Sequence, residues 1–256
     1  MLSPVLPLLR PLLGALIGLV VGGVINLLAD DLPQRMRPRQ PRCIDCRHPY
    51  APPAWLALGQ RFLGGGRCPN CGLPTRRRAL LVEVGMAALF AALPLLIERP
   101  VTRIFAALYV TILILIIVTD LEHRLILHAV TVPGTLLALL GSLFIPGLNL
   151  ALAGLGAVTG FVIFFAFFWL GRALFGPGAL GFGDVTLSTM MGAMVGFPQI
   201  FLALIGGIML AGLVTFTLLL AGMLSMRSTV AYGPFLAIAG ILTILWGEPF
   251  LDWYFS

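Results

Sequence analysis

Two isolated carboxylates stand out in a chain that otherwise avoids charge. Asp120 lies in LIIVTDLEHRLI and Asp184 lies in GALGFGDVTL, each at one end of a long apolar run. An aspartate at the centre of a membrane helix costs about 3 kcal/mol. Two carboxylates held together can share one proton, so that the ionised partner takes a proton from water while the protonated partner polarises a carbonyl. Such a pair can hydrolyse an amide bond.

The segment that leads into Asp184 is rich in glycine. Gly181 and Gly183 flank a phenylalanine in the GFGD sequence. A glycine-flanked backbone bends freely and leaves room beside it. We therefore expect these two glycines to let an extended substrate approach Asp184.

Each aspartate also has a plain structural interpretation. Asp184 directly precedes an apolar run, where an aspartate is a good helix N-cap. Asp120 stands in a charged cluster with Glu122 and Arg124 and fits an ordinary residue at the membrane interface. A transporter would also place carboxylates in a helical bundle, but usually near its midplane and within internal repeats. The chain shows no clear repeat of that kind, so we favour the catalytic pair.

Four cysteines form two C-x2-C pairs: Cys43, Cys46, Cys68 and Cys71. The two pairs are separated by 21 intervening residues, slightly more than in common zinc ribbons. Four thiolates can surround Zn²⁺ as a tetrahedron, and a site closed in this way is structural rather than catalytic. A reducing cytoplasm argues against disulfides. We therefore predict a structural zinc site that folds an insert with little core of its own.

Apolar helices must position these residues. Of the 256 residues, 59% are hydrophobic and 10% charged, whereas a soluble domain carries about 25% charged residues. Continuous apolar runs of about 20 residues predict spanning helices rather than a β-barrel. We predict an all-α polytopic membrane protein with about eight transmembrane spans: 12–28, 79–97, 104–119, 130–145, 150–170, 185–197, 200–224 and 232–246. The fourth and sixth are short and polar-leaning, so we expect them inside the bundle.

Arginine placement predicts the orientation of these spans. The net charge of +6 is carried by arginine, since the chain has no lysine, and ten of its 16 arginines lie in residues 29–78. If this stretch is cytoplasmic, 13 arginines lie inside and three outside, which follows the positive-inside rule. Both termini then lie outside, and we expect no nucleic-acid partner. The first span lacks a small-residue cleavage site, so we expect it to be retained.

The predicted organisation has three parts. Residues 1–28 form the first transmembrane span, residues 29–78 form a cytoplasmic zinc-binding loop with four cysteine ligands, and residues 79–256 form a seven-span membrane bundle. Asp120 ends the third span and Asp184 begins the sixth. Both therefore fall at the cytoplasmic end of the bundle, where their side chains can meet.

Several motifs, in their order and spacing, resemble those of the bacterial prepilin peptidases, or type IV leader peptidases, of the GxGD aspartic protease family. They are GGVIN, the paired CxxC knuckles, LLVEVG, DLEHRLI, GFGDVTL and YGPFLAIAG. The resemblance covers nearly the whole chain. It implies an enzyme of the bacterial inner membrane that cleaves the basic leader from single-span pilin-like or pseudopilin precursors, with Asp120 and Asp184 as its dyad. Many members also methylate the new N-terminus, which implies S-adenosylmethionine as a second cofactor beside Zn²⁺ if this activity is present.

The chain departs from the usual family pattern at two places. Leu127-His128 stands where the family usually has Pro-Asp, and Thr186 stands where a lysine usually follows GxGD. The first change removes a carboxylate and the second removes a positive charge. These changes motivate an alternative, a pilin-assembly component that binds its partners without cutting them. A carboxylate-dependent transporter is the third hypothesis.

Overall fold

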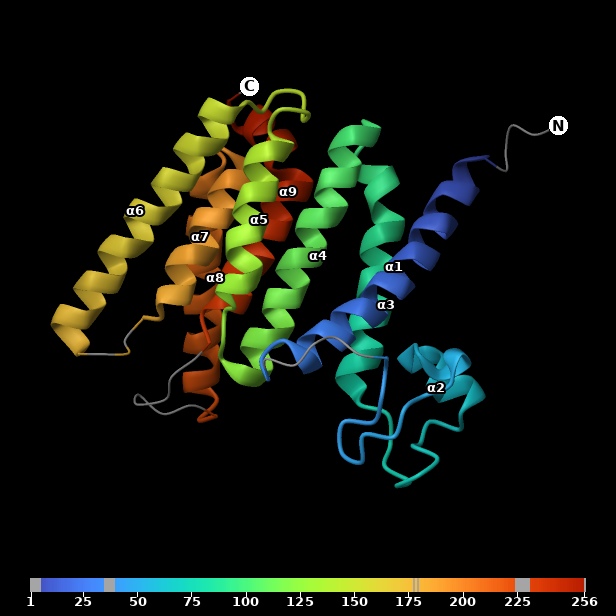
Figure 1. Cartoon of the computed structure of the whole chain (residues 1–256). Helices are drawn as coiled ribbons and strands as arrows, with labels where there is room; N and C mark the ends of the chain where they lie inside the picture. Colours follow the sequence, from blue (N-terminus) through green and yellow to red (C-terminus); the bar gives the residue numbers. More distant parts are fainter. Residues whose placement is uncertain (1–5, 35–39, 177, 179, 224–230, 256) are drawn as a thin grey trace. The chain divides into compact units, whose positions relative to one another are not determined.

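The apolar runs of the sequence form helices in the computed structural model, which describes residues 6–34, 40–176, 178, 180–223 and 231–255. These residues contain no β-strand beyond two isolated bridges. The elements are α1 (Leu6–Asp31), η1 (Pro52–Ala54), α2 (Ala57–Leu63), α3 (Arg77–Leu96), α4 (Pro100–His123), α5 (His128–Gly141), α6 (Leu150–Phe175), α7 (Phe182–Val195), α8 (Ile200–Leu220) and α9 (Gly233–Phe255) (Figure 1). The all-α prediction is confirmed for the described part of the chain.

Each of the eight apolar segments predicted from the sequence corresponds to a helix. Among the described residues, six helices are long and apolar enough to cross a membrane: α1, α3, α4, α6, α8 and α9. Helices α5 and α7 have 14 residues each, or about 21 Å of helix, whereas the hydrocarbon core is about 30 Å thick. The chain is therefore a multi-pass membrane protein, and the count of eight spans is approximate.

Some sequence predictions fall outside the described residues. Arg35, Arg37, Arg39 and Arg227, which contribute to the charge bias, lie there. Helix α8 ends at Leu220, so it is shorter than the predicted span, whose last residue, Leu224, also lies outside.

The chain divides into two compact units, Met1–Arg103 and Ile104–Ser256. In the first unit, α1 packs along α3 in the opposite direction (Figure 1). Gly14, Gly18 and Gly22 repeat every fourth residue on the α1 face that meets α3. A Cβ added at Gly14 or Gly18 would collide with backbone of α3, and one at Gly22 would lie 2.7 Å from the Cα of Glu83. The two helices therefore approach at backbone distance, as small residues permit in membranes.

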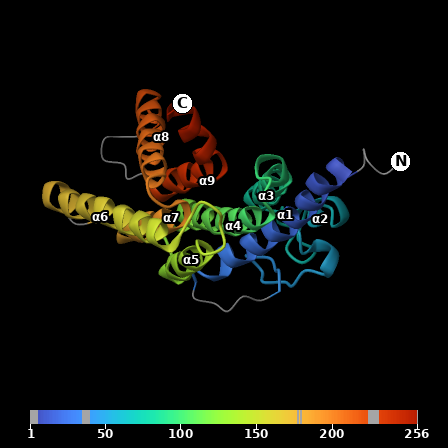
Figure 2. The same cartoon turned by 90° about the horizontal axis from the view of Figure 1, so that it is seen from above.

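The second unit is built around the short helix α7. This helix packs against α5, α6, α8 and α9, and ten of its 14 residues are buried. Gly156 and Gly192 bring α6 and α7 into backbone contact, because a Cβ on either glycine would collide with the carbonyl of the other. Helices α8 and α9 lie side by side (Figure 2). The prediction that the sixth segment lies inside the bundle is confirmed, whereas α5 buries only one face, formed by Thr131, Gly134, Ala138 and Gly141.

We expect Gly18→Ala to destabilise the protein by about 1–3 kcal/mol, because the new methyl group forces α1 away from α3. Gly85→Ala on α3 is the control, since a Cβ there meets nothing within 4 Å. Alanine is the better helix former by about 1 kcal/mol, so this control should be neutral or slightly stabilised. Thermal unfolding of the purified variants in detergent measures both. Equal stability of the two variants would contradict the close approach.

Candidate active site and metal centre

Asp120 lies in the last turn of α4, with 6% of its surface exposed. Its side chain accepts a hydrogen bond from the backbone N–H of Gly233, the first residue of α9. A Cβ at Gly233 would lie 2.6 Å from Oδ2 of Asp120. The start of α9 therefore sits directly against this carboxylate.

Asp184 lies in the first turn of α7, with 7% of its surface exposed. It accepts a hydrogen bond from the backbone of Gly181 and interacts electrostatically with Asp120. The residue at the N-cap position is Gly181, and no side chain caps the helix there. The alternative interpretation of Asp184 as the N-cap is therefore wrong.

Ile126 lies in the connection from α4 to α5, and its side chain is buried. It lies close to Gly183, which precedes Asp184, and to Gly233, which contacts Asp120. A Cβ at Gly183 would lie 2.8 Å from its Cβ, and one at Gly233 would lie 2.9 Å from its Cδ1. Gly183 is helical, and Gly181 has an ordinary extended backbone with φ −77° and ψ 143°. Neither glycine is needed for an unusual backbone conformation at this point. The structure instead uses Gly183 to make room for Ile126, while a role in substrate approach stays a prediction.

The arrangement brings two carboxylates from different helices into one buried environment. Two such groups resist ionising together, because each negative charge opposes the other. In general, a pair of this kind can act as base and acid toward one water molecule.

The two departures from the usual family pattern lie beside this pair. The ring of His128, at the start of α5, stacks on Phe182 at 5.9 Å between centroids. The hydroxyl of Thr186 donates to the carbonyl of Gly183 at 2.9 Å and accepts from Thr131 at 3.3 Å. A ring contact and a hydroxyl chain thus occupy these two positions on α5 and α7.

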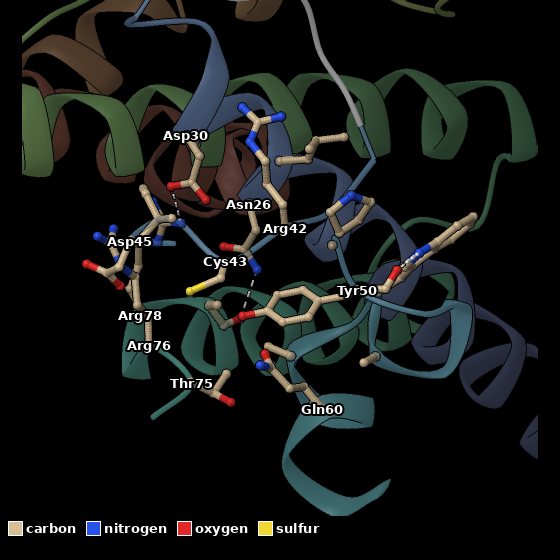
Figure 3. Close-up of a pocket in the computed structure, with 18 of the residues that line it drawn as sticks. Asn26, Asp30, Arg42, Cys43, Asp45, Tyr50, Gln60, Thr75, Arg76 and Arg78 are labelled. Atoms are coloured by element: carbon tan, nitrogen blue, oxygen red, sulfur yellow. Dashed lines mark hydrogen bonds and ion pairs between the residues drawn. The ribbon is translucent and has the colours of Figure 1, made fainter. Parts of the chain in front are cut away.

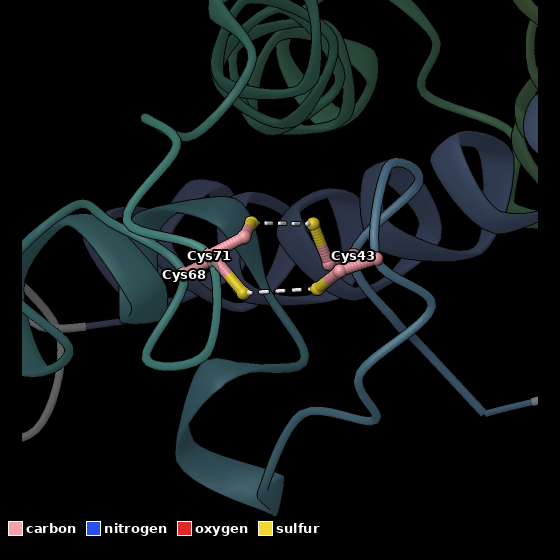
Figure 4. A group of neighbouring side chains, drawn as sticks. Cys43, Cys68 and Cys71 are labelled. Atoms are coloured by element: carbon pink, nitrogen blue, oxygen red, sulfur yellow. Dashed lines mark hydrogen bonds between the residues drawn. The ribbon is translucent and has the colours of Figure 1, made fainter.

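The four predicted ligand cysteines come together in the first unit. Their sulfur atoms all lie within 4.8 Å of one another. Sγ of Cys43 is 3.7 Å from that of Cys71, and Sγ of Cys46 is 3.6 Å from that of Cys68 (Figure 4). Four sulfurs around Zn²⁺ at about 2.3 Å are separated by about 3.8 Å. The cluster therefore has the size of a tetrahedral zinc site with four thiolate ligands, and its cysteines form no disulfide.

The two cysteine pairs lie on two backbone turns of the same kind. The second turn follows the first by 25 residues, so that Cys68 corresponds to Cys43. In the first turn, the N–H of Cys43 donates to His48 and that of Arg47 donates to Cys43. In the second, Cys68 takes the place of Cys43 and repeats both bonds with Leu73 and Gly72. Each turn is closed by one antiparallel bridge, Arg42 with Pro49 and Arg67 with Pro74. The insert is thus a pair of equivalent knuckles, and the shared turn and bridge extend the repeat beyond the C-x2-C spacing that the sequence shows.

The electrostatics of the knuckles favour a bound cation. Backbone N–H groups of Cys71 and Asn70 lower the pKa of the Cys68 thiol to about 6. The N–H of Leu73 acts in the same direction on Cys71, but desolvation and the nearby sulfurs outweigh it and raise that pKa to about 12. Four thiolates cannot all ionise at this distance without a positive charge among them. A divalent metal supplies that charge.

A pocket of about 140 Å³ adjoins the first knuckle (Figure 3). It is lined by the end of α1, both knuckles, α2 and the start of α3. Four of its charged lining residues form two ion pairs, Arg42 with Asp31 at 2.5 Å and Arg78 with Asp30 at 2.8 Å. Cys43 belongs to both the pocket and the cysteine cluster, so a metal there would help to shape the pocket.

Several polar atoms around this pocket are buried without a hydrogen-bond partner among the described residues. They include Oδ1 of Asn26 and Oγ1 of Thr75. Burial raises the pKa of Tyr50, so its hydroxyl stays protonated in the pocket wall. Buried polar groups are normally satisfied. Their concentration here indicates a place for a polar ligand or for ordered water.

Sequence reasoning missed two residues of these sites. It did not single out Glu83, whose carboxylate is buried and accepts hydrogen bonds from the backbone N–H groups of Ala57 at 2.7 Å and Leu58 at 2.9 Å. It thereby ties α2 to α3. Gly233 appeared only within the YGPFLAIAG motif. In the sequence, Gly233 is marked by the consecutive residues Tyr-Gly-Pro at the start of an apolar run.

Comparison with known proteins agrees with this description. Residues 107–216 match the profile of the Type IV leader peptidase family, and residues 16–97 match the Bacterial Peptidase A24 N-terminal domain. A "Prepilin leader peptidase/N-methyltransferase" of Aeromonas hydrophila is 27% identical over 232 residues, 89% of this chain and 79% of the relative. Proteins of the same name from Dichelobacter nodosus and Pseudomonas putida are 30% and 31% identical, over 80% and 81% of this chain and 71% and 72% of theirs. No solved structure matches the chain significantly. The chain belongs to the type IV leader peptidase family.

Proposed function

We propose that the chain is a membrane aspartic endopeptidase that removes the leader from pilin-like precursors, with Asp120 and Asp184 as its catalytic pair. The observation that carries the proposal is the burial of two electrostatically coupled carboxylates, from α4 and α7, within one unit. The names of the relatives supply the substrate class.

In the proposed reaction, the ionised carboxylate takes a proton from a water molecule, and the water oxygen attacks the carbonyl carbon of the scissile peptide. The protonated carboxylate donates its proton toward the carbonyl oxygen. The peptide C–N bond then breaks, the leaving nitrogen receives the proton that was taken from water, and the former carbonyl oxygen returns its proton to the other carboxylate. The products are a leader with a new carboxylate and a shortened pilin with a new amine.

The proposed site lies at the cytoplasmic boundary of the inner membrane. The arginine bias supports an insert on the cytoplasmic side and both termini outside. A precursor with a basic leader and an apolar span would present the bond between them at this boundary. Water reaches such a depth more easily than the membrane midplane.

We further propose that the cysteine cluster holds structural Zn²⁺. Cys43, Cys46, Cys68 and Cys71 would supply all four ligands, which leaves no open position for catalysis. Its role would be to fix the two knuckles that line the pocket of the first unit.

We also propose a second activity, N-methylation of the shortened pilin, in the pocket of the first unit. The relatives are named as N-methyltransferases, and S-adenosylmethionine, when bound, supplies the methyl group for such a reaction. The pocket fits this zwitterionic molecule in chemical type, because it presents both carboxylates and guanidinium groups together with partnerless polar atoms. We propose that Asn26, Tyr50 and Thr75 bind and orient the cofactor there.

Asp120→Asn and Asp184→Asn should each lower the cleavage rate of a matched pilin precursor by about 100-fold or more, because each removes one acid–base group. Glu122→Gln is the control, since this neighbour of Asp120 is exposed and lies outside the pair. Gel mobility and mass spectrometry of the precursor measure cleavage. Wild-type processing by either asparagine variant would disprove the pair.

The same experiment also tests the two alternative functions. A precursor left intact by the wild-type protein would favour the assembly component, and carboxylate-dependent ion flux in liposomes without cleavage would favour the transporter.

Purified protein should contain about one equivalent of zinc per chain, measured by elemental analysis. The Cys68→Ser, Cys71→Ser double variant should lose it, because two of four ligands are gone. Asn70→Ala, between the same two cysteines, should keep it. Full zinc in the serine variant would show that the cluster is not the metal site.

Binding of S-adenosylmethionine should be measurable by calorimetry and should weaken about tenfold in Thr75→Val, which removes a buried hydroxyl at nearly constant volume. Asn26→Ala should weaken it similarly. Thr217→Val, whose hydroxyl is exposed on α8, and Asp184→Asn should bind like the wild type. Unchanged affinity in both pocket variants would remove the cofactor from this pocket.

A further inference from the structure

The first turn of α9 leaves one backbone donor for Asp120. Pro234 has no N–H group, and the N–H groups of Phe235 and Leu236 both point to the carbonyl of Tyr232, at 3.2 and 3.3 Å. The N–H of Gly233 remains, and it donates to the carboxylate of Asp120. The first N–H groups of a helix have no partner within the helix. Asp120 therefore satisfies a free donor at the start of α9.

Only glycine leaves room for this contact. A Cβ at position 233 would lie 2.6 Å from Oδ2 of Asp120 and 3.2 Å from its Cγ. The same Cβ would lie 2.9 Å from Cδ1 of Ile126. Any side chain at Gly233 must therefore displace the carboxylate, the isoleucine or the start of α9.

We propose that Gly233 is the positioning residue of the catalytic pair. Its N–H fixes the carboxylate of Asp120, and its missing side chain lets the start of α9 reach that carboxylate. This inference rests on the proposed peptidase function and adds to it an assignment of roles. Asp120 is the ionised base that takes a proton from water, and Asp184 is the acid.

The charges around Asp120 agree with that assignment. The start of a helix carries partial positive charge and favours an anion beside it, and the Gly233 N–H favours the ionised carboxylate. Arg124, after α4, acts on Asp120 in the same direction, while Asp184, on α7, opposes a second negative charge. Tyr232, which precedes α9, interacts electrostatically with Asp184 rather than with Asp120. Asp120 is thus the member of the pair with both a backbone donor and a cation near it.

The first test is the cleavage kinetics of Gly233→Ala with a purified pilin precursor. We expect kcat to fall about 100-fold with KM changed less than threefold, because the base is displaced while the substrate-binding surface is not. The acidic limb of the pH–rate profile should move to higher pH, since the ionised form of Asp120 has lost a donor. Gly212→Ala on α8, where a Cβ meets nothing within 4 Å, is the matched control and should behave like the wild type.

A second variant separates positioning from packing. Ile126→Val removes Cδ1, the atom that the new Cβ would meet at 2.9 Å, but leaves Asp120 in place. The Gly233→Ala, Ile126→Val double variant should therefore stay as slow as Gly233→Ala. Recovery of the wild-type rate would show that the loss came from packing against Ile126, and would overturn the proposal.

A stability cycle tests the contact without any activity. Gly233→Ala should lower the unfolding temperature in the wild-type background and lower it much less in Asp120→Ala, where the colliding atoms are absent. An equal loss in both backgrounds would refute the contact. The outcomes distinguish the two claims. If Gly233→Ala is active and Asp120→Asn is inactive, only the role of Gly233 is refuted. If Asp120→Asn is active, the catalytic pair itself is refuted.

Discussion

The cost of burying negative charge among apolar helices is the constraint on which the second unit depends. Asp120 and Asp184 are both buried, in a unit whose surface is largely apolar. Each carboxylate accepts a hydrogen bond from a backbone N–H group, that of Gly233 for Asp120 and that of Gly181 for Asp184. Backbone donors lower the cost without neutralising the charge, so both carboxylates remain able to exchange protons.

Close helix packing follows from the same constraint. A backbone donor can reach a buried carboxylate only if no side chain intervenes, and Gly233 meets that condition beside Asp120. Elsewhere, Gly156 and Gly192 bring α6 against α7, which fixes the helix that carries Asp184. The first unit solves a different problem, because its insert has few helical residues. There the paired cysteine knuckles and the buried Glu83 hold the chain beside α1 and α3.

The sequence predicted the helical class, the position of each apolar helix and the cysteine cluster, because each depends on a local pattern of apolar residues or ligand spacing. It also placed Asp120 and Asp184 at matching ends of their helices. It did not predict the contact of Gly233 with Asp120 or of Glu83 with α2, since these join residues far apart in the chain and leave no periodic signal. The N-cap interpretation of Asp184 failed because Gly181 occupies that position. The pocket of the first unit was also missed, because its lining comes from five separate stretches of the chain.

The central claim is that a water molecule, activated by two carboxylates, cuts the precursor. The most direct measurement is mass spectrometry of the leader released from a pilin precursor by purified protein in ¹⁸O-labelled water. The account predicts a single cut between the basic leader and the apolar span, with one ¹⁸O atom in the new leader carboxylate after a single turnover. An intact precursor, or a leader whose new carboxylate carries no label, would contradict it.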